Sequence, residues 1–312
     1  MPELPEVETI RRGLESRMLS RKIRKIRILN EKSWRAPLSE LIFAENHTVI
    51  GIGRRGKMLI IHLSSGHTIL THLRMTGQLI FRESNLTENE IHEGDENSRN
   101  FAGGHPTESF VSDLPDKSTR IIFEFFDGSQ LFFNDQRKFG FVKILPDDFV
   151  EQDDFLAKLG PEIVDFTQKN IAEKPSPETF VKFIENARHH QNSPVKTTIL
   201  DQHVVAGIGN IYADEALWGA KINPQTKVRD LTDEQLRELL IQAKIAMEKS
   251  LAAGGSTMKN YVRADGTKGN YLDLFANVFR REGLPCPRCG TEIVKIKVGG
   301  RGTHFCPKCQ KN

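Results

Sequence analysis

The stretch KMLIIHLSSGHTILTHL at residues 57–73 decides the architecture of the first half of the chain, because it holds two short apolar runs typical of β-strands. An Asp-Gly pair at 127–128 is a typical hairpin turn. Five more strand-like runs flank the quoted stretch, at residues 23–29, 48–53, 120–125, 129–133 and 139–145. Many short strands at this spacing predict a β-sandwich or barrel.

A helix is expected before the first strand. Val7, Ile10, Leu14 and Met18 recur at intervals of three and four residues, which gives one apolar helical face. After residue 148 the strand pattern stops, and helices are expected at 153–159, 176–188, 195–204, 209–219 and 232–252. We therefore predict an α+β protein with domains at 1–148, 149–276 and 277–312.

Charge is distributed unevenly over the 312 residues. Residues 83–116 hold nine acidic and one basic residue, and their polar, aperiodic composition predicts a disordered acidic insertion. By contrast, residues 11–35 contain ten Lys or Arg against two Glu. Basic segments suit a polyanion partner, although a solvated surface explains them equally well.

The chain has neither a run of about 18–20 apolar residues nor a secretory signal pattern, so we expect no membrane partner and a cytoplasmic location. All four cysteines stand at the C-terminal end, as Cys286-Pro-Arg-Cys289 and Cys306-Pro-Lys-Cys309. Two such pairs at this separation are typical of a tetrahedral zinc site with four thiolates and no open position. The sequence predicts one structural zinc, with Arg301 on the turn between the pairs.

The Met-Pro start offers a candidate nucleophile. Removal of the initiator Met would leave Pro2 with a secondary amine, and a neutral α-amine can attack a sugar carbon. Glu3 and Glu6 lie beside it as candidate acids. Taken alone, the same residues are also an ordinary capped helix start.

Six sequence blocks occur in a fixed order along the chain. They are PELPEVETIRRGL (2–14), GRRGK (53–57), HLRMTG (72–77), DQRKFG (135–140), VAGIGNIYADEAL (205–217) and the four-cysteine module. Together they resemble the bacterial formamidopyrimidine-DNA glycosylase family, which repairs 8-oxoguanine. The resemblance covers nearly the whole chain outside the insertion, and it implies an N-terminal β-sandwich, a helix–two-turn–helix domain and a zinc-finger hairpin.

The resemblance also implies residue roles. Pro2 matches the family's nucleophile, Glu3 the acid that assists opening of the sugar ring, Lys57 the lysine of β-elimination and Arg301 the arginine of δ-elimination. A guanidinium stays charged near neutral pH, so we expect Arg301 to act by gripping phosphates rather than by donating a proton.

Further positions match the DNA-binding residues of the family. Flipping a nucleotide out of the duplex leaves a void, which Met75, Arg137 and Phe139 are expected to fill. Asn210 at a helix start and the nearby Lys196 are expected to bind DNA. Two positions depart from the family, since Ser118 and Asn192 stand where a histidine and a basic residue are common. Gln136 and the pair Phe279-Arg280 depart as well.

The resemblance therefore implies a monomeric, bacterial, nucleoid-associated enzyme of DNA repair. It would bind double-stranded DNA with oxidised bases or abasic sites, excise oxidised purines through a Pro2 Schiff base, and cut the strand by β,δ-elimination. Two alternatives stay open: an endonuclease VIII-type enzyme for oxidised pyrimidines, and a catalytically silent DNA-binding zinc protein. The start PELPE and residues 254–271, which resemble the family's base-capping loop, argue against the first alternative.

Overall fold

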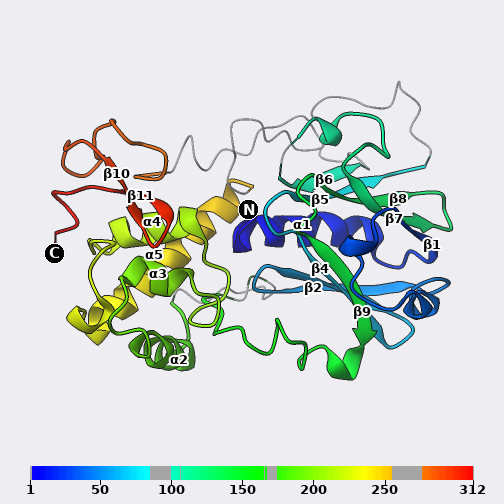
Figure 1. Cartoon of the computed structure of the whole chain (residues 1–312), viewed down its shortest axis with the longest axis horizontal. Helices are drawn as coiled ribbons and strands as arrows, with labels where there is room; N and C mark the ends of the chain where they lie inside the picture. Colours follow the sequence, from blue (N-terminus) through cyan, green and yellow to red (C-terminus); the bar gives the residue numbers. More distant parts are fainter. Residues whose placement is uncertain are drawn as a thin grey trace. The chain divides into compact units, whose positions relative to one another are not determined.

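The computed structural model describes residues 2–84, 100–105, 107–164, 166, 174–254 and 276–311. These form two compact units, one built on residues 2–156 and the other on 157–253 and 276–311 (Figure 1). The expected base-capping loop at 254–271 lies almost wholly outside the described residues. Among those residues, no helix has the length and apolar character needed to cross a membrane.

The first unit contains two antiparallel sheets, as the sequence predicted. One sheet has the order β1-β7-β8-β5-β6 and the other the order β2-β3-β4-β9. The strands of the first are β1 (Ile23–Ile28), β5 (Gly77–Arg82), β6 (Phe101–Gly104), β7 (Thr119–Phe125) and β8 (Gln130–Asp135). Those of the second are β2 (Val49–Arg55), β3 (Met58–Leu63), β4 (His67–His72) and β9 (Phe141–Pro146).

One hydrophobic core joins the two sheets. It contains alternate residues of β3, including Leu59 and Ile61, and alternate residues of β7, including Ile121 and Phe123. This alternation arises because successive side chains of a strand point to opposite faces. The quoted stretch at 57–73 thus forms the hairpin β3–β4 of the sandwich.

Helix α1 (Leu4–Met18) lies between the sheets (Figure 1). It contacts β2 and β3 of one sheet and β5 and β6 of the other. Its predicted apolar face is fully buried, with Ile10, Leu14 and Met18 each at most 1% exposed. Packing of α1 in the hydrophobic core therefore fixes the position of the start of the chain.

The prediction that residues 83–116 are wholly without structure is wrong for the described part. Residues 101–104 form the edge strand β6, and Phe101 packs so closely on α1 that a Cβ at Gly13 would lie 2.2 Å from its ring. Farther on, η4 (Glu108–Phe110) places Phe110 on the outer face of the five-stranded sheet, in a cluster with Ile80 and Phe132. Composition predicted disorder because acidic residues outnumber these few apolar ones.

The second unit is helical, with a terminal hairpin. It contains α2 (Pro177–Arg188), α3 (Val195–Leu200), α4 (Asn210–Gly219), α5 (Asp233–Ala252), β10 (Val294–Val298) and β11 (Arg301–Phe305). A capping box begins α5, where Thr232 Oγ1 accepts from Gln235 N at 3.2 Å. The helix predicted over 153–159 is wrong, since those residues form turns, and the third predicted helix ends at Leu200 rather than at residue 204.

Five short 3₁₀ segments connect these elements among the described residues: η1 (Glu31–Ser33), η2 (Leu38–Phe43), η4 (Glu108–Phe110), η5 (Asp147–Phe149) and η6 (Val228–Asp230). The turn between β10 and β11 is Gly299-Gly300, with φ angles of 53° and 77°. A Cβ at Gly299 would lie 2.1 Å from Thr197 Cγ2, so glycine here serves both the turn and its close approach to α3.

Candidate functional site

The start of α1 buries the first candidate residues. Pro2 is buried and Glu3 is 3% exposed. Glu3 precedes the helix, and its backbone N–H donates to Glu6 Oε2 at 2.8 Å. This bond satisfies one of the N–H groups that a helix start leaves without an intrahelical acceptor. Glu6, a candidate acid in the sequence, is thus engaged in holding the helix start.

Lys57 lies in the turn before β3, directly after Gly56, whose φ is 56°. The lysine is 4% exposed. Arg54 stabilises this turn, because its Nη1 donates to the carbonyl of Gly56 at 3.1 Å. Its Nε also donates to Glu8 Oε2 on α1, at 3.3 Å. Arg54 therefore connects the helix that begins after Pro2 to the turn that carries Lys57.

Glu8 is the centre of this connection and has no exposed surface. Burial disfavours its charged form, but hydrogen bonds and charges from Arg11, Arg12 and Arg54 outweigh burial and lower the pKa of Glu8. A buried carboxylate with several guanidinium partners keeps its charge near neutral pH. The sequence analysis did not assign this residue a role, although it lies inside the motif at 2–14.

Met75 and the pair Arg137 and Phe139 lie on two loops of the first unit. Met75 is half-buried, whereas Phe139 is 51% exposed and carries the Arg137 guanidinium carbon 4.8 Å from its ring centroid. Each loop contains a non-glycine residue with positive φ, Arg74 at 50° and Lys138 at 59°. Such backbone conformations cost free energy and occur often at functional sites.

Asp135 ties these two loops together. Its Oδ1 accepts from the hydroxyl of Thr76 in one loop and, at 3.2 Å, from the N–H of Arg137 in the other. Its Oδ2 accepts from Gly140 N at 2.7 Å. The carboxylate has no exposed surface. Sequence analysis missed this residue because nothing in the motif DQRKFG indicates that its first side chain turns inward.

Two of the departures from the family pattern, Ser118 and Asn192, have local partners. Ser118 is buried, and its Oγ donates to Asp116 Oδ1 at 2.7 Å. Asn192 accepts from Arg229 Nη1 at 2.9 Å through its side-chain oxygen. A guanidinium thus lies beside position 192 even though residue 192 is uncharged. No described contact assigns a comparable cation to Ser118.

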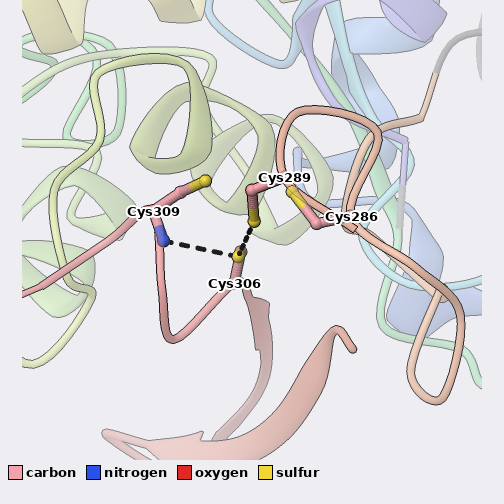
Figure 2. Close-up of side chains that lie close together, drawn as sticks. All are labelled: Cys286, Cys289, Cys306 and Cys309. Atoms are coloured by element: carbon pink, nitrogen blue, oxygen red, sulfur yellow. Dashed lines mark hydrogen bonds between the residues drawn. The ribbon is translucent and has the colours of Figure 1, made fainter. Parts of the chain in front are cut away.

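The four cysteines form one compact cluster (Figure 2). Their sulfur atoms all lie within 4.8 Å of one another, and Cys289 Sγ is 3.5 Å from Cys306 Sγ. Two thiolates from each of two tight turns fit a tetrahedral zinc site and leave no position for substrate. Hydrogen bonds from Thr291 lower the pKa of Cys289 to about 6, whereas burial raises the pKa of Cys306 and raises that of Cys309 to about 12.

Beside the cluster, the hairpin is fastened to the helices by Lys196 and Asp214, both without exposed side-chain surface. Lys196 Nζ lies 2.5 Å from Asp214 Oδ1 and donates to Gly302 O at 3.1 Å and Thr303 Oγ1 at 2.8 Å. Asp214 also accepts from His304 N at 2.9 Å. The ammonium of Lys196 thus faces inward, which differs from the surface position expected of a DNA contact.

Arg301 lies next to this attachment and is exposed. Asn210, the first residue of α4, is half-buried, and its Nδ2 donates to the carbonyl of Gly302 at 2.9 Å. Asn210 and Lys196 thus hold the same carbonyl, one residue beyond Arg301. The arrangement fixes the backbone that carries Arg301 while leaving its side chain accessible.

A second buried carboxylate supports the same module. Glu215 of α4 accepts from the backbone N–H groups of Asn277, Val278 and Phe279, at 2.9–3.1 Å. Burial raises the pKa of Glu215 despite these donors, which favour the charged form. Sequence analysis quoted this residue within a motif but assigned it no role.

Three protein-family models match successive parts of the chain. They are the formamidopyrimidine-DNA glycosylase N-terminal domain (residues 1–142), the formamidopyrimidine-DNA glycosylase H2TH domain (171–262) and a zinc finger found in FPG and IleRS (283–312). A formamidopyrimidine-DNA glycosylase of Ligilactobacillus salivarius is 40% identical over 315 residues, with 99% of both chains covered.

Two solved structures from Lactococcus lactis are also similar over the full length of both chains, each at 32% identity. One is a mutant FPG in complex with a Fapy-dG-containing DNA, with a TM-score of 0.79. The other is a wild-type FPG in complex with an oxidised pyrimidine-containing DNA, with a TM-score of 0.78. In both relatives this fold binds damaged DNA.

Proposed function

Because the chain belongs to the formamidopyrimidine-DNA glycosylase family, we propose that Pro2, Glu3, Lys57 and Arg301 perform the chemistry of that family here. The protein is a DNA glycosylase of base-excision repair with AP lyase activity, its partner is DNA, and its four cysteines hold one structural zinc.

The secondary amine of Pro2 is the nucleophile once Met1 has been removed. Its nitrogen forms a bond to C1′ of the damaged nucleotide, and the base departs with the electrons of the glycosidic bond. Glu3 assists by protonating the ring oxygen as the sugar opens. The resulting iminium draws electrons from C2′, so that loss of a C2′ proton breaks the C3′–O bond. Loss of a C4′ proton then breaks the C5′–O bond, and water hydrolyses the remaining Schiff base, which frees Pro2 and leaves a one-nucleotide gap with phosphate ends.

Lys57 serves the first elimination and Arg301 the second. The observation that supports the first assignment is the link from Glu8 on α1 through Arg54 to the Gly56 carbonyl, which relates the nucleophile's helix to the Lys57 turn. Arg301 acts through its charge, because a guanidinium stays protonated near neutral pH. Its exposed side chain is carried on a hairpin that zinc and the buried Lys196–Asp214 pair hold in place.

The two loops tied by Asp135 fill the space left by the flipped nucleotide. Met75 is an apolar wedge, Phe139 stacks with a neighbouring base, and Arg137 offers donors to the orphaned partner base. Among the remaining candidates, Asn210 and Lys196 set the position of the Arg301 backbone, and Arg229 supplies the charge beside Asn192. Ser118 itself offers no cation, so the phosphate contact of the family histidine is absent at this position.

Borohydride trapping tests the nucleophile. A duplex with 8-oxoguanine should give a covalent adduct with the protein, and mass spectrometry of the digested adduct should locate it on Pro2. Pro2→Gly should lose most of the trapped product, whereas the matched variant Pro5→Ala keeps the N-terminal amine and should be trapped normally. Attachment at Lys57 with a fully active Pro2→Gly protein would overturn the assignment, and absence of any adduct would favour a silent DNA-binding protein.

Lesion preference needs excision rates rather than binding. A relative has been solved with oxidised pyrimidine DNA, so affinity alone does not separate the purine enzyme from an endonuclease VIII-type enzyme. We propose faster excision of 8-oxoguanine and formamidopyrimidine than of thymine glycol, by a monomer acting in the cytoplasm on nucleoid DNA. The reverse order of single-turnover rates would favour the pyrimidine alternative.

A further inference from the structure

Two arginines in the first unit share one aromatic ring. The guanidinium carbon of Arg35 lies 4.1 Å from the ring centroid of Phe141, and that of Arg74 lies 5.8 Å from the same centroid. Phe141 is the first residue of β9 and is 3% exposed, so its ring is a fixed support. Arg35 is exposed and Arg74 half-buried, which leaves both charges accessible.

These two charges are not neutralised by the part of the chain that the structure describes. There, no carboxylate forms an ion pair with Arg35 or with Arg74. Lys143 also lies over the Phe141 ring, at 5.9 Å, but Asp153 pairs with that lysine. Two like charges over one ring repel each other, so the arrangement gains stability when an anion joins them.

The pKa values of neighbouring groups agree with an excess of positive charge at this place. The pKa of His72 is lowered to about 3, first by burial and then by nearby positive charges. Those charges belong to Arg74, Lys57 and Arg35. Burial and the charge of Arg35 also lower the pKa of Arg74. The local potential is positive, and it extends from the two arginines to the lysine proposed for β-elimination.

The backbone holds both arginines in place before any ligand arrives. Arg74 adopts a left-handed φ of 50°, and its N–H donates to His72 Nδ1 at 3.0 Å. Its guanidinium carbon also lies 5.5 Å from the ring centroid of Phe155. The N–H of Arg35 donates to Val142 O at 2.8 Å, which fixes that residue against β9. Preorganised donors bind an anion with a smaller loss of entropy.

We propose that Arg35 and Arg74 together bind a single phosphodiester group of the DNA backbone. The inference rests on the proposed function and adds a binding site to it. A guanidinium presents a planar fork of donors that matches phosphate oxygens, and two forks can grip one phosphate from two sides. Because Arg74 directly precedes Met75, this phosphate lies on the strand that the Met75 loop approaches.

Salt dependence of binding tests the claim of one shared phosphate. Each phosphate neutralised on duplex DNA contributes about 0.9 to the slope of log K against log[salt]. Binding to a duplex with a stable abasic-site analogue should show nearly the wild-type slope for Arg35→Ala and for Arg74→Ala, because one guanidinium remains. The double variant should lose about 0.9. Arg24→Ala, an exposed arginine paired with Glu124, is the matched control and should change nothing.

A scan of the DNA identifies the phosphate. Neutral methylphosphonate groups are placed one at a time along the strand, and one position should weaken binding by the wild type but not by the double variant. The inference would be overturned if the slope were unchanged in the double variant, or if each single variant already lost about 0.9. It would also be overturned if no methylphosphonate position affected the wild type and the double variant differently. Trapping of the wild-type protein at Pro2 is measured separately, so failure of the proposed chemistry is distinguishable from failure of this site.

Discussion

Two buried aspartates hold functional loops in the two units, and they do so by different means. Asp135 in the first unit accepts from a hydroxyl and from backbone N–H groups, all of them neutral donors. Asp214 in the second unit pairs with the charged Lys196 and accepts from His304. The β-sandwich thus carries its loops on its own core, whereas the small hairpin depends on zinc and a buried ion pair.

Breaking the zinc site should have the largest effect. Cys306→Ala removes one of four thiolates, and a module of this size cannot hold its hairpin without metal. We expect loss of zinc, of tight DNA binding and of strand cleavage, while the thermal unfolding of the β-sandwich persists. Metal analysis, a cleavage assay and calorimetry measure these outcomes. Arg301→Ala is the control that keeps zinc, and normal cleavage by Cys306→Ala would show that the hairpin is dispensable.

The next largest effect should come from the buried ion pair. Lys196→Met leaves Asp214 charged, buried and without its ammonium partner, which costs about 3–5 kcal/mol. Denaturation of the second unit, followed by the fluorescence of Trp218, should show this loss. Lys182→Met breaks an exposed pair with Glu178 and should cost less than about 1 kcal/mol. Equal effects of the two variants would mean that burial of Lys196 adds nothing.

Asp135→Asn should have a smaller effect, of about 1–3 kcal/mol, because the new amide directs an N–H toward existing donors. The loops with Met75 and Arg137 should then lose their common support, and discrimination between partner bases opposite the lesion should weaken. Excision measured opposite each of the four bases reports this change. Asp127→Asn alters an exposed turn carboxylate that accepts from Ser129 and pairs with Arg21, outside these two loops, and should leave discrimination intact.

The first unit should also lose stability in acid through His72. A histidine in the unfolded chain has a pKa near 6.5, whereas burial and nearby charges lower the pKa of His72 to about 3 in the folded protein. Between these values the unfolded chain binds the extra proton, so stability falls as the pH falls. From pH 7 to pH 5 the loss should be about 2 kcal/mol.

His72→Asn keeps an acceptor for the Arg74 N–H and should remove that dependence, measured as urea midpoints at the two pH values. The matched variant in the second unit, His203→Asn, replaces an exposed histidine and should behave as the wild type. If both variants keep the wild-type acid response, the charge cluster around His72 does not govern the pH dependence of the first unit.

Sequence reasoning was most successful where the pattern is local. Alternation along 57–73 predicted the β3–β4 hairpin, the spacing from Val7 to Met18 predicted α1, and the cysteine spacing predicted the metal cluster. It did not predict that Lys196 and Asp135 turn inward. Whether a polar side chain faces solvent depends on what the rest of the chain packs against it. The same reason explains why strand β6 was missed, since Phe101 finds its partner at Gly13, far away in sequence.

The cover that Phe110 provides has a practical consequence for protein production. An acidic segment of this kind invites deletion when crystals are wanted. Removing all of residues 83–116 would expose Ile80, Ile122 and Phe132 on the outer face of the sheet and leave β5 as an open edge. An apolar face beside an unpaired strand favours aggregation. A shortened protein that stays soluble should therefore be cut between residues 84 and 100 and keep everything from Phe101 onward.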